Sequence, residues 1–195
     1  MIVISPYAKR LTNGKINPKN YPYWQEVIAN IQEPVIQVGI DGEQQLVDDF
    51  RKNLSIAELS ELILQCRTWI SCDSFFQHLG WIEGKKGIVL WSVSDPLIFG
   101  HAENINLLKD RFNLAANQFL WWEATEHKNE RFVKPQIVLK YLEEKNNLSI
   151  KILKETLDFE RSRSLSATAF EGRKFGVGGL EVKRKKYVEP LKEDN

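Results

Sequence analysis

Residues 68–92 read TWISCDSFFQHLGWIEGKKGIVLWS, which predicts a strand, a helix and a second strand in succession. The two ends of this stretch, 68–72 and 87–92, are short runs of β-branched and other apolar residues, as is typical of buried strands. Between them, Asp73 or Ser74 can cap the N-terminus of a helix. Because strands that alternate with helices form parallel sheets, the stretch predicts an α/β fold.

The alternation of strands and helices continues on both sides of this stretch. Further strands are expected at 2–5, 34–39, 49–52 and 119–122, and further helices at 23–31, 56–66 and 135–142. Ser55 and Glu58 have the spacing of a capping box at the start of one of these helices. Residues 92–106 are expected to form a long loop. The sequence thus predicts one Rossmann-like domain over residues 1–147, with a mostly parallel sheet and helices on both of its faces.

The overall composition excludes several classes of protein. The chain has 195 residues, of which 43% are hydrophobic and 27% charged, so it is not disordered throughout. Its net charge of +1 does not favour a bulk polyanion binder. Cys66 and Cys72 are too few for a disulfide framework and match no zinc pattern, which indicates free thiols in a reducing compartment. Neither a secretory signal nor an apolar run of about 18 residues is visible, so we expect a cytoplasmic protein without a transmembrane segment.

Residues 148–195 differ from the rest and are expected to form a helical or irregular basic extension. Residues 159–195 hold nine basic and six acidic residues, whereas residues 1–158 carry a net charge of −2. One interpretation is a flexible or loosely docked tail. The other is an arm, centred on Lys183–Lys186, that docks to a protein partner or to nucleic acid.

The loops after the predicted strands are where ligands bind in a parallel sheet. The loop at 5–21 carries several cations, among them Lys9 and Lys19, which suit a phosphate but are also typical of a solvated surface. Glu43 follows the strand at 34–39, where an acid commonly accepts hydrogen bonds from ribose hydroxyls. It would equally fit a simple turn. No dinucleotide fingerprint and no P-loop is present.

The helix that follows the strand at 68–72 is a third candidate position. A helix that begins at the end of a strand presents free N–H groups and the positive end of its dipole, which favour an anion. Ser74 can add a hydroxyl donor, and His78, four residues further on, projects from the same face. Asp73 is also a good N-cap, and a single helical histidine is often structural.

The motifs and their order resemble the C-terminal, nucleotide-sugar-binding half of glycosyltransferase family 9, the heptosyltransferase-like enzymes of the GT-B fold. The resemblance covers about residues 1–145 and rests on VISP (3–6), KNYP (19–22), an acid after the second strand, LSIAELSELI (54–63), the D-S-x-x-x-H segment (73–78) and the D-P-x-x-x-G segment (95–100).

This resemblance implies roles for individual residues. Ser5 resembles a phosphate contact, Lys19 the lysine that neutralises the diphosphate, and Glu43 the acid that holds the ribose. The three residues of the D-S-x-x-x-H segment resemble the family's segment near the diphosphate and the sugar. These residues are Asp73, Ser74 and His78. Phe75 replaces the family's usual glycine after the hydroxyl residue, which puts the exact phosphate geometry in question.

The resemblance also implies a reaction and a missing part. Complete transferases of this kind are about twice as long, and their N-terminal half binds the acceptor and usually supplies the catalytic base. We therefore expect a glycosyltransferase-like protein that binds a nucleoside-diphosphate sugar as donor substrate and works with a partner, a second subunit or another copy of itself. The reaction would be inverting and independent of metal or other cofactors, with no catalytic base identified among Glu43, Asp73 and Asp95. The alternative is a non-catalytic binding module that uses the basic tail for a partner.

Overall fold

Six parallel strands form the central sheet of the computed structural model, which describes residues 1–119, 124–144, 176–177 and 180–181. The strands are β1 (Ile2–Ser5), β2 (Val35–Gly39), β3 (Asp49–Lys52), β4 (Thr68–Cys72), β5 (Ile88–Trp91) and β6 (Ile105–Leu108). Their spatial order is β3-β2-β1-β4-β5-β6, which is the order of a Rossmann fold. The two halves of the sheet meet where β1 lies beside β4, and in sheets of this order ligands bind in the crevice outside the carboxyl ends of the strands at such a point.

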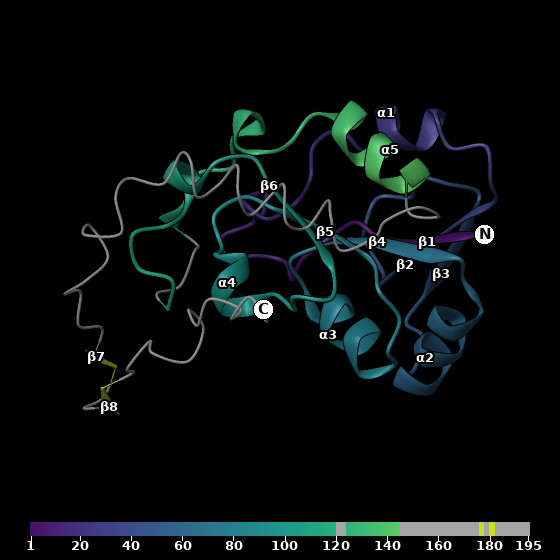
Figure 1. Cartoon of the computed structure of the whole chain (residues 1–195), viewed down its shortest axis with the longest axis horizontal. Coiled ribbons are helices and arrows are strands. Elements are labelled where there is room, and N and C mark those ends of the chain that lie inside the picture. Colours follow the sequence, from purple (N-terminus) through teal and green to yellow (C-terminus); the bar gives the residue numbers. More distant parts are fainter. Residues whose placement is uncertain (120–123, 145–175, 178–179, 182–195) are drawn as a thin grey trace, which may run out of the picture. The chain divides into compact units, whose positions relative to one another are not determined.

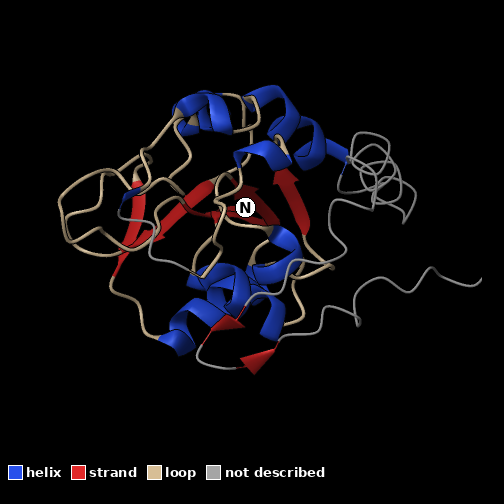
Figure 2. Ribbon diagram, turned by 90° about the vertical axis from the view of Figure 1, so that its left-hand side faces the viewer, coloured by secondary structure: helices blue, strands red, loops and turns tan. Residues whose placement is uncertain are grey.

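Helices cover both faces of the sheet, as the sequence predicted (Figures 1 and 2). They are α1 (Trp24–Ala29), α2 (Ile56–Gln65), α3 (Phe75–Ile82), α4 (Pro96–Phe99) and α5 (Pro135–Glu144), with short 3-10 turns η1 (Arg111–Asn113) and η3 (Asn129–Arg131). One face carries α1 and α5, and the opposite face carries α2 and α3. The α/β, Rossmann-like fold class is therefore confirmed.

The burial of β4 follows from its central position between the two helical layers. All five of its residues are buried, including the polar Thr68 and Ser71. Trp69 packs beneath α2 and α3, whereas Ile70 packs beneath α1 and α5. A strand that is covered on both sides does not show the regular apolar and polar alternation of a half-exposed strand.

One expectation for residues 92–122 was wrong, and a second is tested only at its first residue. The expected loop at 92–106 contains α4 and the start of β6. Asp95 caps α4 by accepting a hydrogen bond from the backbone N–H of Leu97 at 2.9 Å, and Pro96 occupies the first helical position. Phe119, where a strand was expected to begin, lies in a turn, and residues 120–122 lie outside the described residues.

The chain divides into two units, Met1–Leu148 and Ser149–Asn195. In the second unit the described residues are β7 (Gly176–Val177) and β8 (Leu180–Glu181), which pair antiparallel. The rest of the expected extension at 148–195, including Lys183–Lys186, lies outside the described residues. None of the helices described here has the length and apolarity needed to cross a membrane.

The N-terminus of α2 offers a direct test of the predicted capping box. Ser55 Oγ accepts a hydrogen bond from the Glu58 backbone N–H at 3.3 Å, and Glu58 Oε2 accepts one from the Ser55 N–H at 2.8 Å. We expect Ser55→Ala to lower the free energy of unfolding by about 1 kcal/mol in urea titrations, because the Glu58 backbone N–H loses its partner. Ser60→Ala in the middle of the same helix is the control, and an equal effect of both substitutions would contradict the prediction.

Candidate functional site

Lys19 and Asp73 form a buried ion pair that links the loop after β1 to the end of β4. Lys19 Nζ lies 2.7 Å from Asp73 Oδ2, and the two side chains are only 12% and 7% exposed. Asp73 Oδ1 accepts a further hydrogen bond from Gln77 Nε2 at 2.8 Å. The backbone N–H of Lys19 donates to Asn17 Oδ1 at 2.9 Å, which fixes the loop from which the lysine projects. Two residues that the sequence placed on separate loops are therefore in direct contact.

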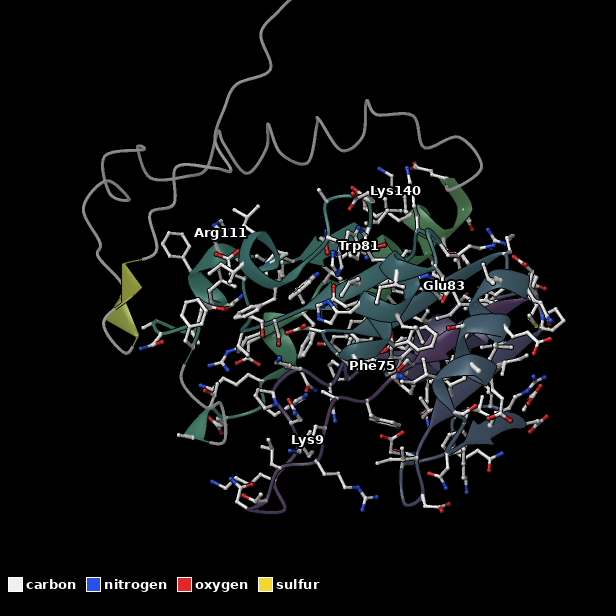
Figure 3. The ribbon with its side chains drawn as sticks, turned by 90° about the horizontal axis from the view of Figure 1, so that it is seen from below. Lys9, Phe75, Trp81, Glu83, Arg111 and Lys140 are labelled. Atoms are coloured by element: carbon white, nitrogen blue, oxygen red, sulfur yellow. The ribbon has the colours of Figure 1, made fainter. Side chains whose placement is uncertain are left out.

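The N-terminus of α3 differs from those of α2 and α4 in having no side-chain cap. Its N-cap residue is Ser74, whose hydroxyl makes no capping hydrogen bond. Asp73, the other expected cap, is instead held by Lys19 and Gln77. The first N–H groups of α3 therefore remain available to an anion from outside the helix. Phe75, the first residue of α3, is 55% exposed, and it is labelled in Figure 3.

Several buried polar atoms close to this point have no hydrogen-bond partner among the described residues. They include Ser71 Oγ in β4, Gln77 Oε1 in α3 and Ser94 Oγ after β5. Each of these residues is at most 1% exposed. Since buried polar groups are nearly always satisfied by protein or water, their concentration near the carboxyl ends of β4 and β5 indicates a polar environment there.

A pair of histidines lies against α3, with His78 in the helix itself and His101 contributed by the segment after α4. His78 Nδ1 lies 2.8 Å from His101 Nε2, and the two rings are nearly perpendicular at 84°. His101 is stacked on Trp81 with ring centroids 4.4 Å apart and planes 6° apart. Burial lowers the pKa of His101, and neighbouring His78 lowers it further, whereas Glu103 acts in the opposite direction. The sequence analysis did not identify His101, although it directly follows the D-P-x-x-x-G segment.

A cavity of about 500 Å³ lies between the loop after β1, the start of α1 and the loop after β2. Its lining includes Tyr7, Arg10, Lys15, Glu43 and His127. Arg10 donates a hydrogen bond from its guanidinium to the Gly42 carbonyl, and this contact joins the two loops. The cavity thus combines cations, one carboxyl group and aromatic rings.

Glu43 is held over the end of β2 by a glycine and a backbone N–H. A Cβ atom at Gly39 would overlap the Glu43 carboxyl group in its present position, so a larger residue would require that side chain to move. Glu43 Oε2 accepts a hydrogen bond from the Ile40 N–H at 3.2 Å. Burial raises the pKa of Glu43, and this effect outweighs the Ile40 hydrogen bond and the charge of Arg10, which act in the opposite direction. Burial, and then Glu43 itself, raises the pKa of Tyr7 to about 12.

The predicted site residues fall into two groups. Asp73, Ser74 and His78 gather around the start of α3, together with Lys19, while Ser5 ends β1 and is the register partner of Ser71 in β4. The second group consists of Glu43, which lines the cavity. No residue of the first group lines this cavity.

Lys9 belongs to neither group. Its side chain is exposed on the loop after β1, and its backbone carbonyl accepts a hydrogen bond from Asn17 Nδ2 at 2.8 Å (Figure 3).

The cysteines and the acidic residues show no sign of a metal centre or a reactive thiol in the part of the chain that the structure describes. No cluster of three or more histidine, cysteine or acidic residues there could hold a metal ion. Cys66 and Cys72 are both buried, and neither forms a disulfide. Burial raises the pKa of Cys72 to about 12, so its thiol stays protonated.

No protein-family model and no curated protein matches the chain. Among solved structures, it is similar to the bacterial iron-containing dodecameric glycosyltransferase TibC from enterotoxigenic E. coli, with a TM-score of 0.49 and 15% identity over 67% of this chain and 40% of that one. It is also similar to the dodecameric iron-containing heptosyltransferase TibC in complex with ADP-D-β-D-heptose, with a TM-score of 0.46 and 15% identity over 67% and 39% of the two chains. The chain therefore spans about two fifths of the length of these proteins.

Proposed function

We propose that this chain binds a nucleoside-diphosphate sugar at the carboxyl edge of its sheet and takes part in transferring the sugar to a hydroxyl acceptor. The observation that supports the proposal is the meeting of Lys19, Asp73, Ser74 and His78 around the start of α3. These are the residues for which the resemblance to glycosyltransferase family 9 implies contact with the diphosphate and the sugar. Their convergence from two distant loops is what a shared ligand would require.

The diphosphate would lie at the start of α3. The first N–H groups of this helix have no side-chain cap, and backbone N–H groups aimed at an anion stabilise charge that develops on a leaving diphosphate. Ser5, at the end of β1, would provide a further contact from the opposite side of the crevice. In this arrangement the chain itself orients and stabilises the leaving group.

The nucleoside would occupy the cavity beside β2. Its volume of about 500 Å³ is in the range of small-molecule sites. Glu43 would accept hydrogen bonds from the ribose hydroxyls, in the position where Rossmann folds carry such an acid. Arg10 and Lys15 line the same cavity and supply positive charge.

The attacking hydroxyl needs a base, and the structure favours one from outside this domain. Asp73 is neutralised by Lys19, and Asp95 caps α4 while accepting hydrogen bonds from Arg111 at 2.7 and 3.3 Å. Glu43 lies in the cavity proposed for the nucleoside. A partner domain, a second subunit or another copy of the chain would then supply both acceptor site and base, in an inverting reaction without metal.

Calorimetry with UDP-, ADP- and GDP-sugars and the free nucleoside diphosphates tests this proposal. We expect one nucleotide to bind saturably and Glu43→Gln to weaken it about tenfold, because the ribose loses a charged acceptor. Glu61→Gln on the exposed face of α2 is the control and should leave affinity unchanged. Absence of binding by every compound would refute the proposal, and equal affinities of the Glu43 and Glu61 variants would remove Glu43 from the site.

A further inference from the structure

The positive charge at the start of α3 is smaller than the sequence indicates. Lys19 is the residue that the family resemblance implies would neutralise the diphosphate. Its ammonium group, however, lies 2.7 Å from the Asp73 carboxylate. The pair is buried and has no net charge. A sugar diphosphate carries two negative charges, so the site needs a cation that Asp73 does not already neutralise.

His78 can supply that cation, because its Nδ1 atom already has a partner that accepts a proton. When the His78 ring is protonated, its Nδ1–H can donate to Nε2 of a neutral His101 across the observed 2.8 Å. Its other N–H, on Nε2, is then left for an anion. No hydrogen bond to Nε2 of His78 is found among the described residues.

His101 is held in place for this task by contacts on several sides. Its ring is stacked on Trp81, and its backbone carbonyl accepts a hydrogen bond from Asn106 Nδ2 at 2.9 Å. Asn106 Oδ1 in turn accepts the indole N–H of the fully buried Trp91 at 2.9 Å. These contacts from Trp91 through Asn106 hold the His101 ring in place beside the His78 ring.

The groups around His101 favour its neutral form. Burial and His78 lower the pKa of His101, and Glu103 only partly opposes them. On the α3 side, the Lys19–Asp73 pair is neutral, and Glu83 lies at the far end of the helix (Figure 3). A neutral His101 ring has a nitrogen that can accept a hydrogen bond from His78 Nδ1.

We propose that His78 and His101 form a proton-linked anion receptor, in which a diphosphate at the start of α3 is met by a protonated His78 and neutral His101 holds the opposite side of that ring. The proton comes from solvent, and no bond of the ligand is broken. His101 is a positioning residue in this arrangement. The inference rests on the proposed function for the identity of the ligand, but the receptor itself can be tested without a nucleotide.

The first experiment uses inorganic sulfate, which does not titrate near neutral pH. We expect imidazole NMR spectra of the full chain to show that sulfate, compared with chloride at equal ionic strength, moves the titration midpoint of the His78 ring to higher pH. His101→Leu should abolish this shift, because a protonated His78 would lose its acceptor. His101→Gln should restore it, because a glutamine carbonyl can accept the same proton. A His78 ring that titrates identically in both salts would overturn the inference.

The second experiment measures protons taken up on binding a nucleotide sugar, by calorimetry at pH 7 in buffers of different ionisation enthalpy. We expect uptake of about 0.5 to 1 proton per ligand in the wild type and in His101→Gln. His101→Leu should show little uptake and about tenfold weaker binding. Glu83→Gln, at the end of the same helix, is the matched control. Binding without proton uptake refutes the receptor alone, whereas a sulfate response without nucleotide-sugar binding refutes the proposed function alone.

Discussion

Asp73→Ala should lower the free energy of unfolding by about 3 to 5 kcal/mol, because it leaves the buried Lys19 ammonium group without its counter-charge. The lysine side chain is 12% exposed and cannot become fully hydrated without moving the loop after β1. The substitution also removes the acceptor of the Gln77 hydrogen bond. Since a domain of this size is stable by only about 5 to 15 kcal/mol, the loss should be plain in a urea titration.

An exposed ion pair in the same sheet provides the matched control. Asp49 Oδ2 lies 3.0 Å from Arg51 Nη2, but both side chains are nearly half exposed. Asp49→Ala should change stability by about 0.5 kcal/mol or less. Combining Asp73→Ala with Lys19→Met should recover most of the loss, with a coupling of about 2 kcal/mol or more. Similar effects of Asp73→Ala and Asp49→Ala, or simple additivity with Lys19→Met, would show that the Lys19 charge is not effectively buried.

The Rossmann-like fold could be predicted because its strongest signals are local. β4 lacks the alternation of a half-exposed strand because both of its faces are buried, and the Ser55–Glu58 capping box lies within one helical turn. β6 escaped notice because Asn106 interrupts its apolar pattern. The side chain of Asn106 is used to bind the Trp91 indole and the His101 carbonyl, which are tertiary contacts that no local pattern reveals.

The candidate site could be predicted as a set of residues but not as an arrangement. The sequence and the family resemblance identified Lys19 and Asp73 as separate contacts for a ligand, whereas the structure pairs them with one another. Pairing of this kind depends on which strands are neighbours, and β1 and β4 are far apart in the sequence. Glu43 was grouped with the same residues, but the loop after β2 directs it into the cavity beside α1. The contact between His78 and His101 depends in the same way on the path of the chain after α4.

Gly87→Ala should be among the most damaging single-methyl additions in the chain. Gly87 immediately precedes β5, and a Cβ atom there would overlap the ring atoms Cδ2, Cε2 and Cε3 of Trp69. The Trp69 ring cannot easily move away, because it is fully buried, contacts Phe76 edge-on and donates its indole N–H to the Lys85 carbonyl at 2.9 Å. We expect a loss of about 3 kcal/mol in a urea titration.

Two further variants separate steric overlap from a general effect of replacing glycine. Gly84 has a positive φ of 66° but open space around its Cα, so Gly84→Ala should cost only about 1 kcal/mol through backbone strain. Trp69→Phe makes space by removing part of the indole, so the double variant Gly87→Ala, Trp69→Phe should be more stable than the sum of its single effects predicts. If the two effects simply add, the overlap with Trp69 is not the cause. A rescue would instead establish that Trp69, in the strand that leads to the proposed diphosphate site, requires a glycine at position 87.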